Sequence, residues 1–346
     1  MRQASRLGMA IRDSDPGYFA LVMATGILSR AMQLNGAAPL SGILLATGIA
    51  AYLLLTAAYA WRLAAYRSRI HADAADPRRA FGFFTLSAGS DVLAAQLAGD
   101  GHTAVATVLL VIGGTSWALL SYGLPLLLAG ERTSRPALAG ANGTWFLWAV
   151  ATQSIAVGLT SLPSGVPGAA ALAVTCWAIG VVLYLLVAGL VTVALLTYPV
   201  GPAELTPPYW VFMGATAISV LAGAQILQLP PSPLSAAVHA VLAGLSVMLW
   251  AFGTWLIPLL VVLGVWRHVV RRVPLTYEPG MWSIVFPVGM YAVASHELGI
   301  ALKVSWLVTL GRDAAWPALA TWTAVFVAMI ATLLRRSSRP AEGRPA

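Results

Sequence analysis

Residues 281–299, MWSIVFPVGMYAVASHELG, combine an apolar stretch with residue types that a lipid-facing helix avoids. Pro287 lies near the middle, and His296 and Glu297 lie near the end. Proline removes a backbone hydrogen-bond donor and kinks a helix. Ionisable side chains inside an apolar segment are costly and normally face a protein interior or a wet cavity. The combination indicates a helix with one side protected from lipid.

The residue before this proline is a candidate constriction. Helical steps of about 100° put Phe286, Met290, Val293 and Glu297 on one stripe. Pro287 would set the direction in which the Phe286 ring points. We therefore expect Phe286 to occlude a conduit as a hydrophobic gate, with an ordinary packing role as the alternative.

Charged residues inside apolar segments form a second candidate group. We expect Arg30 to pair with Asp91, with Glu297 as the competing partner. This pair can be structural, or Arg30 can attract a substrate directly. His296 and Glu297 can form a proton relay, because histidine titrates near neutrality, or a polar cluster near Lys303.

A hydroxyl residue recurs six positions after an aromatic residue in four apolar segments. Each hydroxyl lies about 12 Å into its helix at about 1.5 Å per residue. Such groups can replace part of an anion's hydration shell without holding it by a full charge. The alternatives are coincidence and a bond to the preceding helical turn. The predicted pore-lining hydroxyls are Thr25 after Phe19, Ser90 after Phe84, Thr152 after Phe146 and Thr216 after Trp210, whereas Trp282 is followed by Val288.

The elements that would position these residues are membrane-spanning helices. The chain is 59% apolar and 9% charged, with a mean hydropathy of +0.81, whereas soluble domains carry roughly 25% charged residues. A span needs roughly 20 mostly apolar residues. Ten segments qualify, at about 17–34, 39–61, 81–98, 103–129, 141–160, 168–197, 209–229, 236–265, 281–302 and 306–334.

The basic residues predict the orientation of these spans. Seventeen of the 20 lysine and arginine residues fall on one side of the ten-span arrangement, and that side is cytoplasmic by the positive-inside rule. The net charge of +8 is explained in this way rather than by nucleic-acid binding. We expect a cytoplasmic tail at 1–16, a permeation domain at 17–334 and a cytoplasmic tail at 335–346 in a multi-pass protein of the cell membrane. The 17 residues are Arg2, Arg6, Arg12, Arg62, Arg67, Arg69, Arg78, Arg79, Arg132, Arg135, Arg267, Arg271, Arg272, Arg335, Arg336, Arg339 and Arg344.

The polar residues also predict how the helices are arranged. Most ionisable and amide side chains within spans belong to the odd-numbered spans. Because such groups avoid lipid, we expect the five odd helices to form an inner pore ring and the five even helices an outer ring. The predicted fold class is an all-α integral membrane protein of five helical hairpins.

Three segments resemble a known family. PGYFALVMATGILS (16–29), FGFFTLSAGSDVLA (81–94) and WSIVFPVGMYAVAS (282–295) are similar to the tellurite-resistance/C4-dicarboxylate transporter family, which includes plant slow anion channels and fungal malate and sulfite permeases. The resemblance implies a central anion pore lined by the odd helices. It also implies a pore-plugging phenylalanine on the ninth helix, here Phe286, and a homotrimer with one pore per subunit.

The expected function is permeation of a small anion, such as a C4-dicarboxylate, sulfite, chloride, nitrate or a tellurium oxyanion. One alternative is a proton-coupled dicarboxylate carrier that uses Asp91, His296 or Glu297. A second is an intramembrane enzyme, which would need paired acids or a Ser–His pair facing one cavity. Motifs for phosphate, dinucleotide or zinc binding are absent, and the single cysteine, Cys176, cannot form an internal disulfide. We therefore expect no enzyme activity, cofactor or metal.

Overall fold

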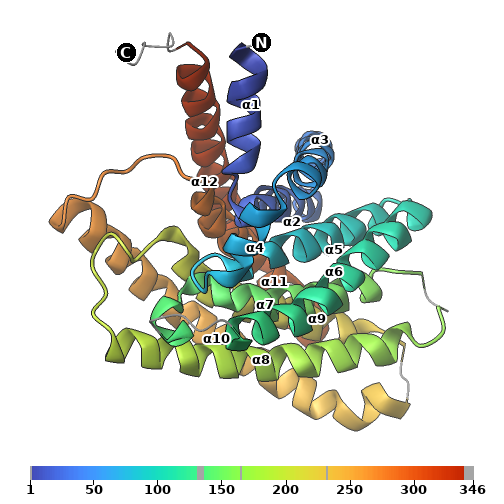
Figure 1. The fold of residues 1–346 in the computed structure, drawn as a ribbon. Coiled ribbons are helices and arrows are strands. Elements are labelled where there is room, and N and C mark those ends of the chain that lie inside the picture. Colours follow the sequence, from blue (N-terminus) through green and yellow to red (C-terminus); the bar gives the residue numbers. More distant parts are fainter. Residues whose placement is uncertain (1, 131–135, 164–165, 231–232, 339–346) are drawn as a thin grey trace, which may run out of the picture.

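The computed structural model of this chain describes residues 2–130, 136–163, 166–230 and 233–338. Within these ranges every regular element is a helix (Figure 1). Four of the basic residues used to predict orientation, Arg132, Arg135, Arg339 and Arg344, lie outside the described residues.

Ten of the α-helices within the described ranges pack as five consecutive antiparallel hairpins. Short connections join the two helices of three hairpins, and residues with positive φ make their turns: Gly36 (72°), Gly101 (86°) and Lys303 (58°). Glycine adopts this left-handed conformation without steric cost. The hairpins are α2 (Ala20–Leu34) with α3 (Ala38–Ala65), α5 (Phe84–Gly99) with α6 (Thr103–Gly130), α7 (Leu147–Thr160) with α8 (Ala169–Thr197), α9 (Val211–Gln228) with α10 (Pro233–Val265), and α11 (Trp282–Leu302) with α12 (Ser305–Ser338).

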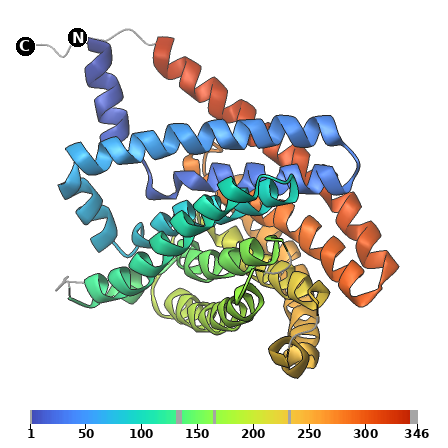
Figure 2. The same cartoon turned by 90° about the vertical axis from the view of Figure 1, so that its right-hand side faces the viewer.

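The first helices of the hairpins form a closed inner ring. Helix α2 contacts α5, α5 contacts α7, α7 contacts α9, α9 contacts α11, and α11 returns to α2. The second helices lie at the periphery, with α3 and α12 on one side of the bundle and α8 and α10 on the other (Figure 2). The most apolar stretches of α9 and α11 are 78% buried, against 17–22% for α3, α6, α10 and α12. Apolar helices that leave most of their surface uncovered suit a lipid environment.

Helix length separates two groups within the described residues. Seven helices are long and apolar enough to cross a membrane: α3, α6, α8, α10, α12, and α9 and α11 with their preceding turns. The three other inner helices are shorter, with 15 residues in α2, 16 in α5 and 14 in α7. The structure therefore describes an α-helical protein with several membrane-length helices.

Each inner helix begins with a short 3₁₀ turn, which the sequence patterns did not predict. The five turns contact one another in a second closed ring. Gly143 packs against the backbone of Pro208 so closely that a Cβ atom would lie 2.1 Å from the Pro208 carbonyl oxygen. A residue without a side chain is therefore needed there. The turns are η1 (Pro16–Phe19), η2 (Ala80–Phe83), η4 (Gly143–Phe146), η5 (Pro207–Trp210) and η7 (Pro279–Met281).

The segments outside the bundle also contain helices. The region predicted as an N-terminal tail includes α1 (Arg2–Arg12), which projects from the bundle (Figures 1 and 2), and α12 continues past residue 334 to Ser338. Helix α4 (Arg67–Ala75) follows α3. Buried Arg62 of α3 ties these parts together, because it forms an ion pair with Asp73 and donates a hydrogen bond to the Arg12 carbonyl at 3.1 Å.

Candidate functional site

Each inner helix has a buried residue at an equivalent position near the centre of the ring. The repeated aromatic residue lies within one residue of the junction between 3₁₀ turn and α-helix in all five cases. In each helix the residue four positions after this aromatic is buried, and the five residues differ in size. These five residues are Met23, Ala88, Val150, Gly214 and Phe286.

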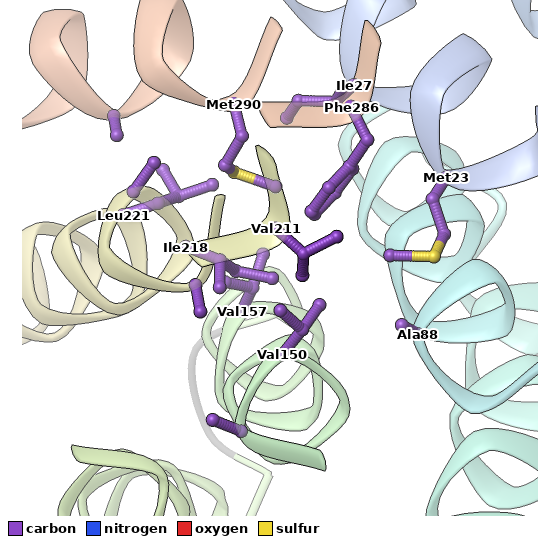
Figure 3. Packing of buried hydrophobic residues seen from close by; sticks show 14 of the residues in the cluster. Met23, Ile27, Ala88, Val150, Val157, Val211, Ile218, Leu221, Phe286 and Met290 are labelled. Carbon is purple, nitrogen blue, oxygen red and sulfur yellow. The ribbon is translucent and has the colours of Figure 1, made fainter. Parts of the chain in front are cut away.

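Phe286 is the largest of the five residues. Its side chain is 1% exposed and points into the ring interior together with Met23, Val150, Val211 and Met290 (Figure 3). Ala88 on α5 and Gly214 on α9 are small, so they leave room for the phenyl ring of Phe286. Gly214 packs against Pro287 of α11, where a Cβ atom would lie 2.7 Å from the proline Cγ. Helices α9 and α11 are therefore in close contact beside Phe286, whose side chain adds apolar atoms to the ring interior.

A cavity of about 320 Å³ opens beyond Phe286, toward the C-terminal ends of the inner helices. We call it the C-terminal vestibule. All five inner helices contribute to it, including all five residues that lie eleven positions after the repeated aromatic: Arg30, Ala95, Val157, Leu221 and Val293. Its other lining residues are Gly26, Ile27, Val92, Gln96, Gly99, Thr160, Ser161, Gln225, Gln228, Leu229, Met290 and Glu297.

Polar side chains join the inner helices around this vestibule. The Arg30 Nη2 atom lies 3.3 Å from Glu297 Oε1, and Arg30 Nη1 donates to Gln33 Oε1 at 3.0 Å. Gln228 Nε2 donates to Glu297 Oε2 at 3.2 Å. Gln96 Nε2 donates to Gln33 Oε1 at 3.3 Å. The sequence placed Glu297 second to Asp91 as the partner of Arg30, whereas in the structure Arg30 pairs with Glu297.

A second cavity, of about 200 Å³, lies at the opposite end of the ring. We call it the N-terminal vestibule. The 3₁₀ turns surround it, so the amino ends of all five inner helices converge there. Helix amino ends carry partial positive charge from their unpaired N–H groups. The lining residues are Asp15, Gly17, Arg78, Arg79, Gly82, Thr85, Asn142, Thr144, Leu147, Thr206, Pro208, Glu278, Pro279, Gly280 and Ser283.

The four hydroxyls predicted to line a pore are placed elsewhere. Thr25 Oγ1 accepts a hydrogen bond from Trp322 of α12 at 3.0 Å, and Thr152 Oγ1 accepts one from Trp117 of α6 at 2.7 Å. Ser90 Oγ lies 2.9 Å from the Tyr52 hydroxyl of α3. Thr216 donates to its own helix at the Met213 carbonyl, facing Gly253 of α10. The described linings of both vestibules omit all four, so these hydroxyls belong to the contacts between inner and outer helices.

The physical reason is helical rotation. The buried residue near the centre of the ring follows the aromatic by four positions and the hydroxyl follows it by six. Two helical steps rotate a side chain by about 200°. A hydroxyl at that position therefore points almost directly away from the ring interior.

Asp91 and His296 also face away from the vestibules. Asp91 is fully buried and accepts a hydrogen bond from Ser154 of α7 at 2.9 Å. His296 packs against Gly311 of α12, where a Cβ atom on the glycine would lie 2.5 Å from the His296 backbone nitrogen. Glu297 is one helical step further on and faces the C-terminal vestibule instead. Of these three residues, Glu297 lines a vestibule, whereas the described linings of both vestibules omit Asp91 and His296.

Three glutamines of the C-terminal vestibule were not assigned a role from sequence. Gln96, Gln225 and Gln228 line it, and Gln225 Oε1 accepts a hydrogen bond from Thr160 at 2.8 Å. The signal that could have found them is the concentration of glutamine near the ends of odd-numbered spans. Among the described residues, no group of three or more His, Cys, Asp and Glu side chains gathers as a metal site would require.

A closed ring of buried helices, wrapped by membrane-length apolar helices and hollowed at both ends, defines an α-helical membrane protein of the channel and transporter class. The chain belongs to the voltage-dependent anion channel (SLAC1) family, whose pattern matches residues 14–330. This match confirms the resemblance described above.

Two similar proteins are described as a membrane protein and as a transporter. The chain is 51% identical over 160 residues to an uncharacterized membrane protein of Mycobacterium tuberculosis, covering 45% of this chain and 81% of the relative. It is 21% identical over 334 residues to an uncharacterized transporter of Methanocaldococcus jannaschii, covering 92% of each chain. Anion transport across the membrane is the activity that the family indicates.

Proposed function

We propose that this protein conducts small anions along the axis of the inner ring, between the two vestibules, and that Phe286 is the gate. One observation carries the proposal: Phe286 lies between a vestibule at each end of the ring and is the largest of the five residues that meet at its level. Apolar constrictions stop permeation because an ion cannot shed its hydration there. In this packing the gate is closed.

The chemistry of the vestibules supports an anionic substrate. The C-terminal vestibule offers amide and hydroxyl donors and one guanidinium, and its 320 Å³ has room for roughly ten water molecules at about 30 Å³ each. A small anion can therefore enter with part of its hydration shell. C4-dicarboxylate, sulfite, chloride, nitrate and tellurium oxyanions all fit this description. The N-terminal vestibule adds five helix amino ends, which favour negative charge.

The proposed topology has ten membrane spans. The 14-residue α7 is about 21 Å long at 1.5 Å per residue, and its four-residue 3₁₀ turn adds about 8 Å at 2.0 Å per residue. Together these lengths approach the roughly 30 Å thickness of the hydrocarbon core. The same holds for α2 and α5 with their turns. By family resemblance, we propose a homotrimer with one pathway per subunit, which mass determination of the purified protein would test.

The decisive experiment measures anion flux through purified protein in liposomes. Replacing Phe286 by alanine removes the constriction, so chloride and nitrate flux should rise at least about tenfold if the barrier falls by about 1.4 kcal/mol or more. Phe146→Ala is the matched control, because Phe146 is equally buried but stacks on Phe212 with ring centroids 4.6 Å apart. Unchanged flux in well-folded Phe286→Ala protein would refute the gate assignment.

The same liposomes separate a channel from a proton-coupled carrier. A channel predicts flux that follows the electrical potential and persists when a protonophore is added. A carrier predicts uptake that collapses under that condition. The described linings of the two vestibules include Glu297 but neither Asp91 nor His296, and this placement supports the channel. It also argues against an intramembrane enzyme, which would need its acids or a Ser–His pair in one cavity.

A further inference from the structure

The C-terminal vestibule contains one cation and one anion among its described lining residues, and they are in contact. These residues are Arg30 of α2 and Glu297 of α11. The guanidinium of Arg30 has five N–H donors in a planar fork that fits carboxylates and oxyanions. An anion that enters the vestibule therefore finds the Arg30 guanidinium already in contact with another anionic group, the Glu297 carboxylate.

The contact between the two side chains is weak in its geometry. It uses one nitrogen and one oxygen at 3.3 Å, whereas strong arginine–carboxylate pairs are bidentate and shorter, at about 2.7–2.9 Å. The Arg30 side chain is 37% exposed, and Glu297 is 10% exposed. Donors of Arg30 that do not face Glu297 or Gln33 therefore remain open to the cavity, and water can screen the pair.

Glu297 has a second anchor that can hold it when it leaves Arg30. Gln228 of α9 donates to the other carboxylate oxygen at 3.2 Å. The carboxylate can consequently move off the guanidinium without losing all of its hydrogen bonds. Arg30 likewise keeps its bond to Gln33, so its guanidinium stays in place while its partner changes.

We propose that Glu297 is a tethered competitor for the permeating anion: its carboxylate occupies Arg30 in the empty vestibule, and an anion binds Arg30 by displacing it. This inference rests on the proposed function and deepens it by assigning a binding residue and a built-in inhibitor. Glu297 sets how much anion is needed at the C-terminal side before permeation saturates. Small planar or tetrahedral oxyanions that match the guanidinium should compete best.

The test is single-channel recording in planar bilayers, with nitrate varied on one side at a time. All variants carry Phe286→Ala, so that the current is measurable. Glu297→Gln keeps the size and the bond to Gln228 but removes the charge. We expect the half-saturating nitrate concentration to fall about two- to fivefold, the range for an ion pair that water can screen, and only from the side of the C-terminal vestibule.

Two further variants distinguish direct competition from a general effect of charge. Glu297→Asp keeps the charge but shortens the side chain, so it should shift saturation in the same direction as Glu297→Gln. In an Arg30→Gln background, Glu297→Gln should have no effect, because the contested site is gone. The inference would be overturned if Glu297→Gln left the half-saturating nitrate concentration unchanged. It would also be overturned if Glu297→Gln changed that concentration equally with and without Arg30. Neither result would contradict anion permeation itself. A protein with Phe286→Ala alone that carries no anion current would overturn the proposed function itself.

Discussion

Thr25 shows how two helical positions separate a side chain that faces the ring interior from one that holds the molecule together. Met23 points inward (Figure 3), whereas the Thr25 hydroxyl accepts the indole N–H of Trp322 on α12. The same division holds for Val150 and Thr152, whose hydroxyl accepts the indole N–H of Trp117. These two hydroxyls near the depth of Phe286 therefore serve contacts between inner and outer helices.

Replacing Thr25 by valine should leave anion flux unchanged and lower stability. The change leaves the partly buried indole N–H of Trp322 without its acceptor, which costs up to about 1–3 kcal/mol. Flux into liposomes and thermal unfolding in detergent would measure the two effects. Thr47→Val on α3 is the control, because its exposed hydroxyl bonds only to the Ile43 carbonyl of its own helix. A marked loss of flux without a loss of stability would return Thr25 to the pore lining.

Some residues that stood out in the sequence lie in the ring interior or the C-terminal vestibule, and others lie elsewhere for a physical reason. Phe286, Arg30 and Glu297 stand out because a proline, a lone cation and a lone acid are costly in lipid unless they are protected. The hydroxyls were misplaced because a shared spacing from an aromatic residue fixes depth, not direction. The partner of Arg30 was ranked wrongly because depth alone favours Asp91, while the side on which each residue lies decides the contact.

At the scale of elements, the five hairpins interlock around the ring. An aromatic side chain of each outer helix bonds to the inner helix of the next hairpin. Hydrogen bonds between helices inside a membrane contribute roughly 0.6 kcal/mol on average, so five such contacts stabilise the ring modestly but fix its register. The contacts are Tyr52 to Ser90, Trp117 to Thr152, Trp177 to the Ser219 carbonyl, Trp250 to Ser295 and Trp322 to Thr25.

The contact that closes the ring joins the last hairpin to the first. Trp322→Phe removes the donor to Thr25 but keeps an aromatic ring stacked on Phe326. We expect the free energy of unfolding to fall by about 1 kcal/mol and the anion flux into liposomes to stay unchanged. Trp306→Phe on the same helix is the control, because Trp306 is 58% exposed and lies at the periphery. Equal effects of the two changes would show that the hydrogen bond contributes nothing.

The hairpins could be predicted from sequence, whereas the 3₁₀ turns could not. Apolar runs of the right length, separated by short polar linkers, are a strong signal for spans. The turns are short segments such as PGYF and GTWF, and their conformation depends on contacts with neighbouring turns. Gly143 against Pro208 is one such contact between distant parts of the chain. No local pattern encodes it.

At the scale of the whole molecule, the positions of the basic residues and of the hairpin turns predict how the protein is oriented in the membrane. Helices α1 and α4 carry basic residues on the side where the inner helices begin, and the turns Gly36, Gly101 and Lys303 lie at the opposite ends of their hairpins. By the positive-inside rule we therefore expect the N-terminal vestibule to be cytoplasmic. The C-terminal vestibule, with Arg30 and Glu297, would face outward and receive anions from outside.

Cysteine labelling in intact cells would test this orientation. Cys176 is buried and is first replaced by alanine, so each variant has one cysteine. His102→Cys, in the turn after α5, should react with a membrane-impermeant maleimide in intact cells. Ser68→Cys on α4 is the matched control and should react only after the membrane is permeabilised. Both positions are exposed in the structure, so a difference in labelling reports the side of the membrane. The reverse pattern would place Arg30 and Glu297 at the cytoplasmic mouth, and the anions they select would then be those leaving the cell.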